Sequence, residues 1–471
     1  MTGHIVIDDV RPRTPHHEHP AKAIIGEAVR VSADVFKDGH SLLGARVRWR
    51  PAGESKWIDA PMRNLTNDRW EAVIEPAALG LHTFLVEAWT DRYATWRKET
   101  AVKHDAGQKV ALECMEGADI LDDQATRVAE GDRALLTEAA ATLRDENLAI
   151  EERLAAGLDP ALAVALDGVP DDRDRTEGEP YGLWVDRERA LVGAWYELFP
   201  RSEGGLRATA DRRLPAVAAM GFDVVYTPPV HPIGRTHRKG RNNTLEPGPH
   251  DPGSPWAIGS SEGGHTAVAP ELGTLEDFDY FVDTARGLGM EVAIDYALQC
   301  SPDHPWVADH PEWFHRRADG SIQYAENPPK KYQDIYPINF WPDSEDARAA
   351  LWDACREILE FWIGHGVRIF RVDNPHTKPI AFWEWLIPAI QAQHPEIVFL
   401  AEAFTRPKPM AKLAEVGFSQ SYTYFTWRTF KTELREYLEE LSQSHKVDYM
   451  RPNFWPNTPD ILSGPLRNGP P

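Results

Sequence analysis

The strongest constraint on the fold comes from two short apolar stretches that each end in an acidic residue. The first covers residues 366–372 and ends at Asp373, and the second covers residues 397–401 and ends at Glu402. Between them, residues 382–393 are rich in apolar side chains in a helical pattern. Strand, helix and strand with a carboxylate at each carboxyl end predict a βαβ unit of an α/β barrel or an open sheet. In both folds the chemistry lies at that end of the strands.

Arg371 and Asp373 are two positions apart, so a strand places them on the same face. An Asp beside an Arg in an enclosed site stays ionised at neutral pH, because the cation lowers its pKa. Taken alone, the pair fits a structural buried ion pair better than a reactive carboxylate. The second acid, Glu402, reverses this preference. Two carboxylates at neighbouring strand ends suit glycoside chemistry, in which one attacks the anomeric carbon and the other handles protons.

The sequence around these acids resembles a known family. Residues 370–376 and 401–403 resemble the α-amylase superfamily, glycoside hydrolase family 13. Within that superfamily, residues 327–337 and 295–300 are similar to the α-1,4-glucan:maltose-1-phosphate maltosyltransferases. The resemblance extends over essentially the whole chain to Asp460, and motifs of this length are specific.

Composition and charge exclude several classes of protein. With 51 basic and 73 acidic residues, the formal net charge is −22, which argues against nucleic acid or an anionic membrane as the main partner. No apolar run is long enough to span a membrane, and the N-terminus lacks the apolar core of a signal peptide. The three cysteines, Cys114, Cys300 and Cys355, have no metal or redox spacing. We therefore expect a reducing, cytoplasmic location.

Hydrophobic patterning divides the chain into three parts. Alternation from about residue 27 to residue 89 predicts an N-terminal β-sandwich domain over residues 1–108. A three-four spacing of apolar residues predicts a helical bundle insert over residues 109–180, whose apolar stripe needs a partner on its own chain or on a second subunit. Alternating strands and helices predict a catalytic (β/α)8 (TIM) barrel over residues 181–471, with a small insertion domain at about residues 301–341.

The barrel pattern gives only seven strands. Eleven residues follow Asp460, and both an eighth strand and the C-terminal β-domain of the family are missing. We therefore expect the chain to be a truncated barrel from a longer protein, and we expect it to fold weakly or to lack activity.

The resemblance implies three catalytic carboxylates. Asp373 would be the nucleophile, Glu402 the general acid/base, and Asp460 the third carboxylate, which holds the sugar ring. Pro459 stands where most of the superfamily has His, as it does in the maltosyltransferases. At positions 299 and 300, where typical amylases have Asn and His, this chain has Gln299 and a cysteine. These departures count against ordinary amylase activity.

The resemblance also implies a phosphate site, which requires converging cations and donors. Lys330 follows two prolines that stiffen the backbone, and Asn374 can donate an amide hydrogen. Lys330 and its neighbour Lys331 would by themselves most often be a solvated charge pair. The resemblance instead favours Lys330 as the phosphate ligand. The other substrate-binding residues that it implies are Lys239, Gln299, Tyr332 and Arg371.

The function implied by the resemblance is retaining transfer of a maltosyl unit from α-maltose 1-phosphate to the non-reducing end of an α-1,4-glucan. It implies a homodimer. It also implies that no metal or organic cofactor is needed. One alternative is an α-1,4-glucan hydrolase that uses the same carboxylates with water as acceptor. Another is a catalytically silent glucan-binding protein with a platform of Trp57, Trp89 and Trp96, although intact catalytic acids argue against it.

Overall fold

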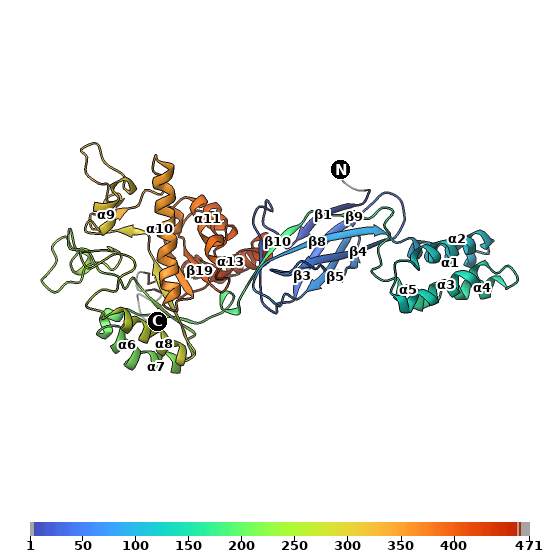
Figure 1. Cartoon of the computed structure of the whole chain (residues 1–471), viewed down its shortest axis with the longest axis horizontal. Helices are drawn as coiled ribbons and strands as arrows, with labels where there is room; N and C mark the ends of the chain where they lie inside the picture. The colour runs from blue at the N-terminus through green and yellow to red at the C-terminus, as the bar shows by residue number, and fades with distance from the viewer. Residues whose placement is uncertain (1–3, 459–460, 463–471) are drawn as a thin grey trace. The chain divides into compact units, whose positions relative to one another are not determined.

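The computed structural model describes residues 4–458 and 461–462 of the 471-residue chain (Figure 1). By its internal contacts the chain divides into two compact units, Met1–Val185 and Asp186–Pro471. No helix in the described ranges is both long enough and apolar enough to cross a membrane. The two units are described in turn.

The first unit contains two antiparallel sheets. One has the strand order β1-β3-β7-β6, and the other has the order β2-β10-β8-β4-β5, with β9 paired to β8. The strands are β1 (Val6–Arg11), β2 (Ala21–Ile24), β3 (Val29–Phe36), β4 (Leu43–Arg50), β5 (Ile58–Pro61), β6 (Arg63–Thr66), β7 (Arg69–Ile74), β8 (Gly80–Thr90), β9 (Thr176–Glu177) and β10 (Tyr181–Asp186).

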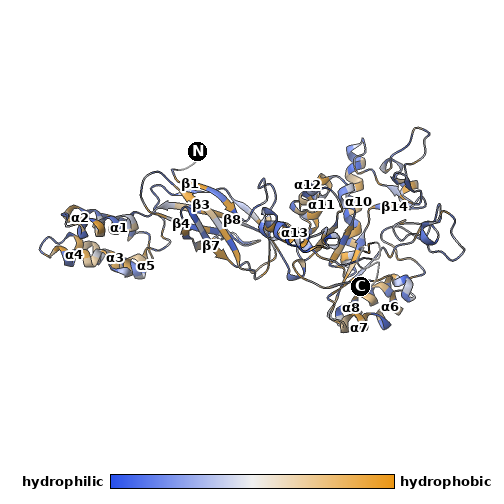
Figure 2. Ribbon diagram, turned by 180° about the vertical axis from the view of Figure 1, so that it is seen from behind, coloured by the Kyte–Doolittle hydropathy of each residue, from blue (hydrophilic) through white to orange (hydrophobic). Residues whose placement is uncertain are grey.

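The alternation in the sequence accounts for these sheets. Buried and less buried residues alternate along β3, and Figure 2 shows the corresponding change between hydrophobic and hydrophilic residues. One apolar cluster contains Val31 from the first sheet and Val47 from the second, both fully buried, so the two sheets share a core. Trp89 and Trp96 are buried as well, which counts against the tryptophan platform of the glucan-binding alternative.

Five helices complete the first unit: α1 (Arg92–Asp105), α2 (Ala111–Gln124), α3 (Glu130–Arg144), α4 (Ile150–Gly157) and α5 (Pro160–Ala165). The predicted apolar stripe is present, since Leu136, Ala140 and Leu143 lie fully buried in one cluster. The helical part begins earlier than position 109. Asp91 caps α1 by accepting a hydrogen bond from the backbone N–H of Ala94 at 2.8 Å, which starts a helix directly after β8.

The second unit is built on a parallel sheet in the order β11-β12-β13-β18-β19-β20-β21. These strands are β11 (Trp195–Glu197), β12 (Val224–Thr227), β13 (Glu291–Tyr296), β18 (Ile369–Asp373), β19 (Val398–Glu402), β20 (Gln420–Tyr422) and β21 (Pro452–Asn453). All seven strands predicted from the sequence are confirmed. Their order in the sheet follows the chain, as expected for strands joined by right-handed crossovers.

The helices of the second unit are α6 (Leu206–Arg212), α7 (Leu214–Ala219), α8 (Leu275–Gly287), α9 (Pro305–Asp309), α10 (Glu345–Gly364), α11 (Ile380–Gln391), α12 (Pro407–Glu415) and α13 (Lys431–Gln443). Fully buried Trp362 of α10 and Trp383 of α11 pack in the same apolar cluster as Phe370 of β18. Residues 301–341 contain α9 and the short strands β15 (Ala325–Asn327), β16 (Lys330–Tyr332) and β17 (Tyr336–Pro337); β17 pairs with β14 (Gln299–Cys300).

The parallel sheet begins later than residue 181, where the sequence analysis started the barrel. In the structure, β10 pairs antiparallel with β8, with Tyr181 opposite Phe84. The chain thus returns to a sheet of the first unit after the helices, and the parallel sheet begins at Trp195. The partner of β10 lies about a hundred residues earlier in the sequence, so no local pattern could reveal the pairing.

Candidate active site

The carboxyl ends of β13, β18 and β19 meet at one edge of the parallel sheet. Asp295 of β13 lies opposite Arg371, and Asp373 of β18 lies opposite Glu402 of β19. The left-handed backbone of Asn374, with φ of +43°, and the proline that follows it end β18 directly after Asp373. The predicted βαβ unit with an acid at each strand end is therefore present, and the register of the strands places four charged side chains side by side.

Arg371 binds all three acids. Its Nη1 lies 3.1 Å from Oδ2 of Asp295 and 2.9 Å from Oδ1 of Asp373, and its Nη2 lies 2.8 Å from Oε1 of Glu402. The guanidinium carbon also lies 5.7 Å from the ring centre of Tyr226 and 5.8 Å from that of Tyr422. Only 5% of the Arg371 side chain is exposed. One desolvated cation therefore fixes the positions of three carboxylates.

The charges of this cluster do not cancel. One guanidinium cannot neutralise three buried carboxylates, so the cluster retains a proton near neutral pH. Burial raises the pKa of Glu402 to about 8, against the lowering effect of Arg371. Burial also raises the pKa of Asp295, to about 6. Burial therefore favours the protonated form of Glu402, which is the state required of a general acid.

Asp295 is fixed by two further donors. The Tyr226 hydroxyl donates to its Oδ2 at 2.6 Å, and the Trp256 indole N–H donates to the same oxygen at 3.1 Å. Gln299 joins this arrangement through its amide, which donates to the backbone oxygen of Trp256 at 3.2 Å. Trp256, which the sequence analysis did not identify, thus links the predicted residue Gln299 to Asp295.

Asn374 contacts both central acids. Its backbone N–H donates to Oε2 of Glu402 at 3.2 Å, and its side-chain amide lies 3.4 Å from Oδ1 of Asp373. Sequence reasoning missed Lys378, whose ammonium donates to the backbone oxygens of Asp373 at 3.1 Å and of Asn374 at 3.3 Å. Burial lowers the pKa of Lys378. The only feature of the sequence that could have indicated this contact is a lysine five positions after Asp373. The loop conformation, which the sequence does not reveal, turns its side chain back toward the end of β18.

The remaining predicted ligands lie on loops. Lys239 is 5% exposed, and its ammonium donates to Oε1 of Gln333 at 3.2 Å. Lys330 and Tyr332 lie on β16, where Lys330 pairs with Asn327 across a two-residue turn. In the described part of the chain, the exposed Lys330 has no hydrogen bond or ion pair to either central acid. Asp460 lies outside the described residues.

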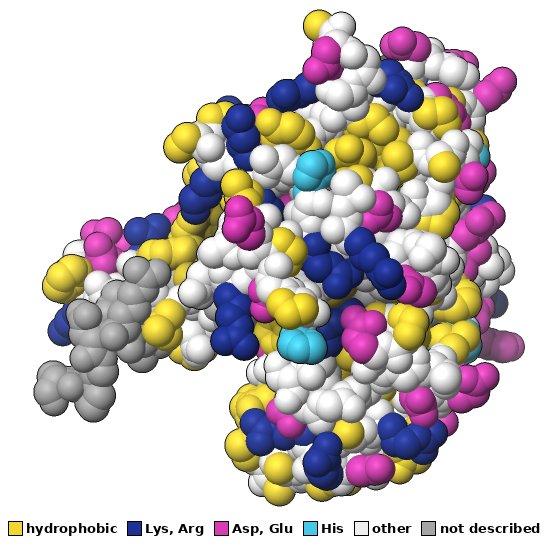
Figure 3. Space-filling view, turned by 90° about the vertical axis from the view of Figure 1, so that its left-hand side faces the viewer, with side chains coloured by type: hydrophobic (Ala, Val, Ile, Leu, Met, Phe, Trp, Pro, Cys, Tyr) yellow, Lys and Arg dark blue, Asp and Glu magenta, His cyan; other side chains and the backbone are white. Residues whose placement is uncertain are grey.

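The loop-bearing face of the second unit carries both signs of charge. Figure 3 shows a group of Lys and Arg side chains near the middle of this face, with acidic side chains next to it and both kinds interspersed over the rest. Within the described ranges, no group of three or more His, Cys, Asp or Glu side chains is arranged to hold a metal ion.

Comparison with known proteins gives one consistent result. A family model described as "Alpha-1,4-glucan:maltose-1-phosphate maltosyltransferase, domain N/S" matches residues 3–187. A protein of Streptomyces coelicolor named α-1,4-glucan:maltose-1-phosphate maltosyltransferase 2 is 54% identical, over 99% of this chain and 70% of its own length. Proteins of the same name from Chlorobaculum tepidum and Pseudomonas aeruginosa are each 49% identical, and the chain covers 70% and 69% of their lengths.

Solved structures are more distant. An α-amylase from Lactobacillus plantarum is 25% identical with a TM-score of 0.44, over 54% of this chain and 60% of the amylase. An α-amylase from H. orenii is 16% identical with a TM-score of 0.39, over 54% of this chain and 58% of that one.

Proposed function

The chain belongs to the α-1,4-glucan:maltose-1-phosphate maltosyltransferase family, and we propose that it moves maltosyl units from α-maltose 1-phosphate to the non-reducing ends of α-1,4-glucans, releasing phosphate. The observation that carries this proposal is the in-register pair Asp373 and Glu402, held by one guanidinium. The two carboxylates bind terminal nitrogens of the same guanidinium, at 2.9 Å and 2.8 Å. Carboxyl groups held this close together suit the retaining class of glycoside chemistry, in which they lie about 5–5.5 Å apart.

In the first step, a carboxylate oxygen of Asp373 attacks the anomeric carbon of the donor. The bond from that carbon to the phosphate oxygen breaks, and a maltosyl ester forms on Asp373. Glu402 enters this step with its proton, because burial raises its pKa to about 8. It can give that proton to the departing phosphate, and it is then a carboxylate, ready for the second step.

In the second step, the 4-hydroxyl at the end of the glucan attacks the same carbon. Glu402 takes the hydroxyl proton as a new glycosidic bond forms and the ester bond to Asp373 breaks. Two inversions at one carbon retain the α configuration. Arg371 stabilises the carboxylate of Asp373 before the ester forms and again after it breaks, and we assign Asp460 to holding the sugar ring.

Substrate binding is assigned by the same reasoning. The ammonium of Lys330 is exposed and makes no ion pair within the described residues, so it is free to take the phosphate together with Asn374 and Tyr332. Buried Lys239 and half-buried Gln299 are assigned to the maltosyl unit. The hydrolase alternative uses the same pair of acids, with water as acceptor.

We also propose the finer architecture and the setting of the enzyme. The domains are an N-terminal β-sandwich, a helical bundle insert and a (β/α)8-type catalytic barrel with a small insertion domain near residues 301–341. A homodimer would cover exposed apolar side chains of the helices, among them Leu112 (64% exposed) and Val164 (78% exposed). The three cysteines are free and buried, in keeping with a reducing cytoplasm.

Phosphate release from maltose 1-phosphate, with and without added glucan, tests the reaction. Any release by the unsubstituted chain should depend on glucan, and Asp373→Ala should abolish it while leaving the circular dichroism spectrum unchanged. Glu402→Ala is expected to release about one phosphate per site and to gain the mass of one maltosyl unit. Glucan-dependent turnover by folded Asp373→Ala, or release of maltose in place of transfer by the wild type, would overturn the proposal.

A further inference from the structure

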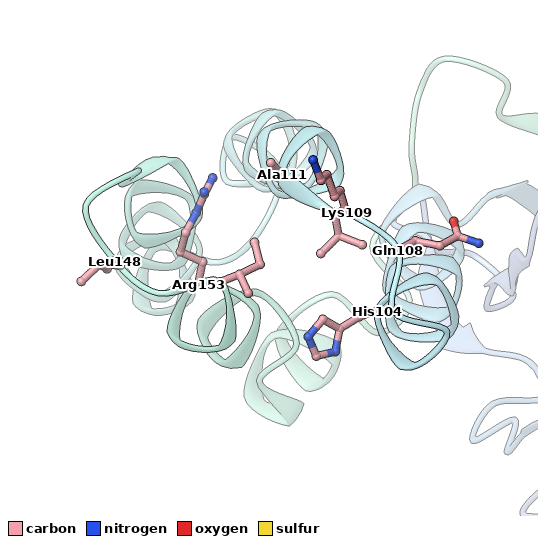
Figure 4. A pocket seen from close by; sticks show the side chains of 9 residues that line it. His104, Gln108, Lys109, Ala111, Leu148 and Arg153 are labelled. Atoms are coloured by element: carbon pink, nitrogen blue, oxygen red, sulfur yellow. The ribbon is translucent and has the colours of Figure 1, made fainter.

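A second site of a different kind lies in the first unit. A cavity of about 510 Å³ opens among helices α1, α2 and α4, and Figure 4 shows His104, Lys109 and Arg153 on different sides of it. None of the residues that line it is acidic. Acidic residues outnumber basic ones by 73 to 51 in this chain, so composition does not explain a cavity with two permanent cations, a histidine and no carboxylate.

Arg153 is the central observation. It is 6% exposed, and its Nε donates to the backbone oxygen of Leu143 at 2.8 Å. In the described part of the chain, Arg153 forms no ion pair. Its terminal nitrogens are not among the buried atoms that lack a hydrogen-bond partner, so the end of the guanidinium remains accessible at the cavity. An anion in the adjoining cavity would supply the missing negative charge.

The backbone reinforces this charge. Val110, the N-cap of the 14-residue helix α2, lines the cavity, and its side chain cannot accept a hydrogen bond. The first N–H groups of α2 therefore have no side-chain cap, and the positive end of the helix dipole lies at the cavity wall. Lys109 precedes this N-cap and brings an ammonium to the same end of the helix.

The nearest acids do not cancel the positive charge. Glu113 in the first turn of α2 is bound by Lys103 at 2.9 Å, and neither residue lines the cavity. Glu152 in the first turn of α4 accepts a hydrogen bond from the backbone N–H of Ala149 at 3.2 Å. Asp105, whose side chain is 86% exposed, approaches His104 only to 4.0 Å.

We propose that this cavity binds the phosphate group of a small metabolite, with the oxyanion between Arg153, Lys109, His104 and the N-terminus of α2. The shape of the cavity supports an organic part on the ligand. A water molecule occupies about 30 Å³ in the liquid, so an oxyanion a few times larger fills only part of the space. The aliphatic side chains of Val110 and Ile150 line the remainder. This site is independent of the phosphate leaving group at the catalytic carboxylates, which belong to the second unit.

Titration calorimetry with inorganic phosphate at constant ionic strength tests the site. The experiment uses the Lys330→Ala background, so that phosphate binding at the catalytic cluster is suppressed. The double variant His104→Gln/Lys109→Gln is expected to bind phosphate at least tenfold more weakly than its parent. Lys98→Gln serves as the matched control, because Lys98 is an exposed residue of α1 that does not line the cavity. It should bind phosphate as its parent does.

Arg153→Gln should abolish the binding, and thermal unfolding of each variant verifies that the helices are intact. Glucose 1-phosphate distinguishes two sources of the anion: tighter binding than inorganic phosphate supports an esterified metabolite, and equal binding supports free phosphate. The proposal is overturned if no heat of phosphate binding is detected, or if the cavity variants and Lys98→Gln bind equally well.

Discussion

Two buried arginines, Arg371 and Arg153, occupy opposite electrostatic situations. Arg371 is surrounded by Asp295, Asp373 and Glu402, whereas Arg153 binds one backbone oxygen and no carboxylate within the described residues. Each is at most 6% exposed. Burial, together with the neighbouring acids Asp373 and Asp295, raises the pKa of Glu402, so the acids around the first cation retain a proton. Arg153 has no acidic partner within the described residues, and in our proposal an anionic ligand supplies the negative charge. The same residue type thus serves proton transfer in one unit and anion binding in the other.

Arg371→Met is expected to change the free energy of unfolding more than any other substitution that tests this comparison. The substitution leaves three carboxylates together without their cation, and breaking a buried ion pair typically costs about 3–5 kcal/mol. Urea unfolding at pH 7 measures the free energy, with the substitution Arg153→Met as the matched control. Protonation of the acids should reduce the loss at pH 5. A loss below about 1 kcal/mol at pH 7 would show that Arg371 does not hold the cluster together.

An intermediate effect is expected from Glu402→Gln. Burial raises the folded-state pKa of Glu402 to about 8, whereas the ordinary value is 4.5. Between these values the folded state binds a proton that the unfolded state does not, so this group's contribution to stability falls as pH rises. The slope is at most about 1.4 kcal/mol per pH unit.

The variant cannot titrate at this position. We therefore expect its stability relative to the wild type to increase from pH 5 to pH 8, as measured by urea unfolding across that range. Subtracting the two curves removes contributions from groups outside the cluster, including His231, His265 and His304, whose pKa values are lowered by burial. A constant difference across the range would contradict the assignment of the proton to Glu402.

The smallest effect is expected from Arg153→Met itself. The variant loses one hydrogen bond to Leu143, worth about 1 kcal/mol, and removes a buried charge that has no partner. The net change in unfolding free energy without added anions should therefore stay within about 1 kcal/mol. In the Lys330→Ala background, millimolar phosphate should stabilise the parent but not the Arg153→Met variant, as read from thermal unfolding. A loss as large as that of Arg371→Met would place Arg153 in the structural core instead.

The sequence predicted the parts of the catalytic cluster that depend on one strand. Period-two alternation placed Arg371 and Asp373 on one face, and the acid at the end of the next apolar run identified Glu402. That a single guanidinium reaches Asp295 on one neighbouring strand and Glu402 on the other depends on register across three strands. Register is set by tertiary pairing and has no local signal.

Other parts of the site escaped prediction for similar reasons. The contacts of Tyr226 and Trp256 with Asp295 join residues 69 and 39 positions apart. The fold-back of Lys378 depends on the left-handed turn at Asn374, a conformation that few non-glycine residues adopt. The cavity of the first unit is formed by three helices. Its positive charge could not be predicted from the sequence, because each basic residue taken alone resembles a solvated surface residue.

The return of the chain to β8 has a consequence for modularity. Ala88 lies opposite Thr176, and Phe84 lies opposite Tyr181, so the segment from Asp91 to Arg175 departs from and rejoins adjacent positions of one antiparallel ladder. All five helices thus occupy the place of a hairpin loop. A short turn could replace them without changing any strand pairing in the sheet, and the helical segment could be exchanged between relatives as a cassette. Because the strand pairing does not depend on the helices, the helical segment can bind a ligand of its own without a change in the sheet.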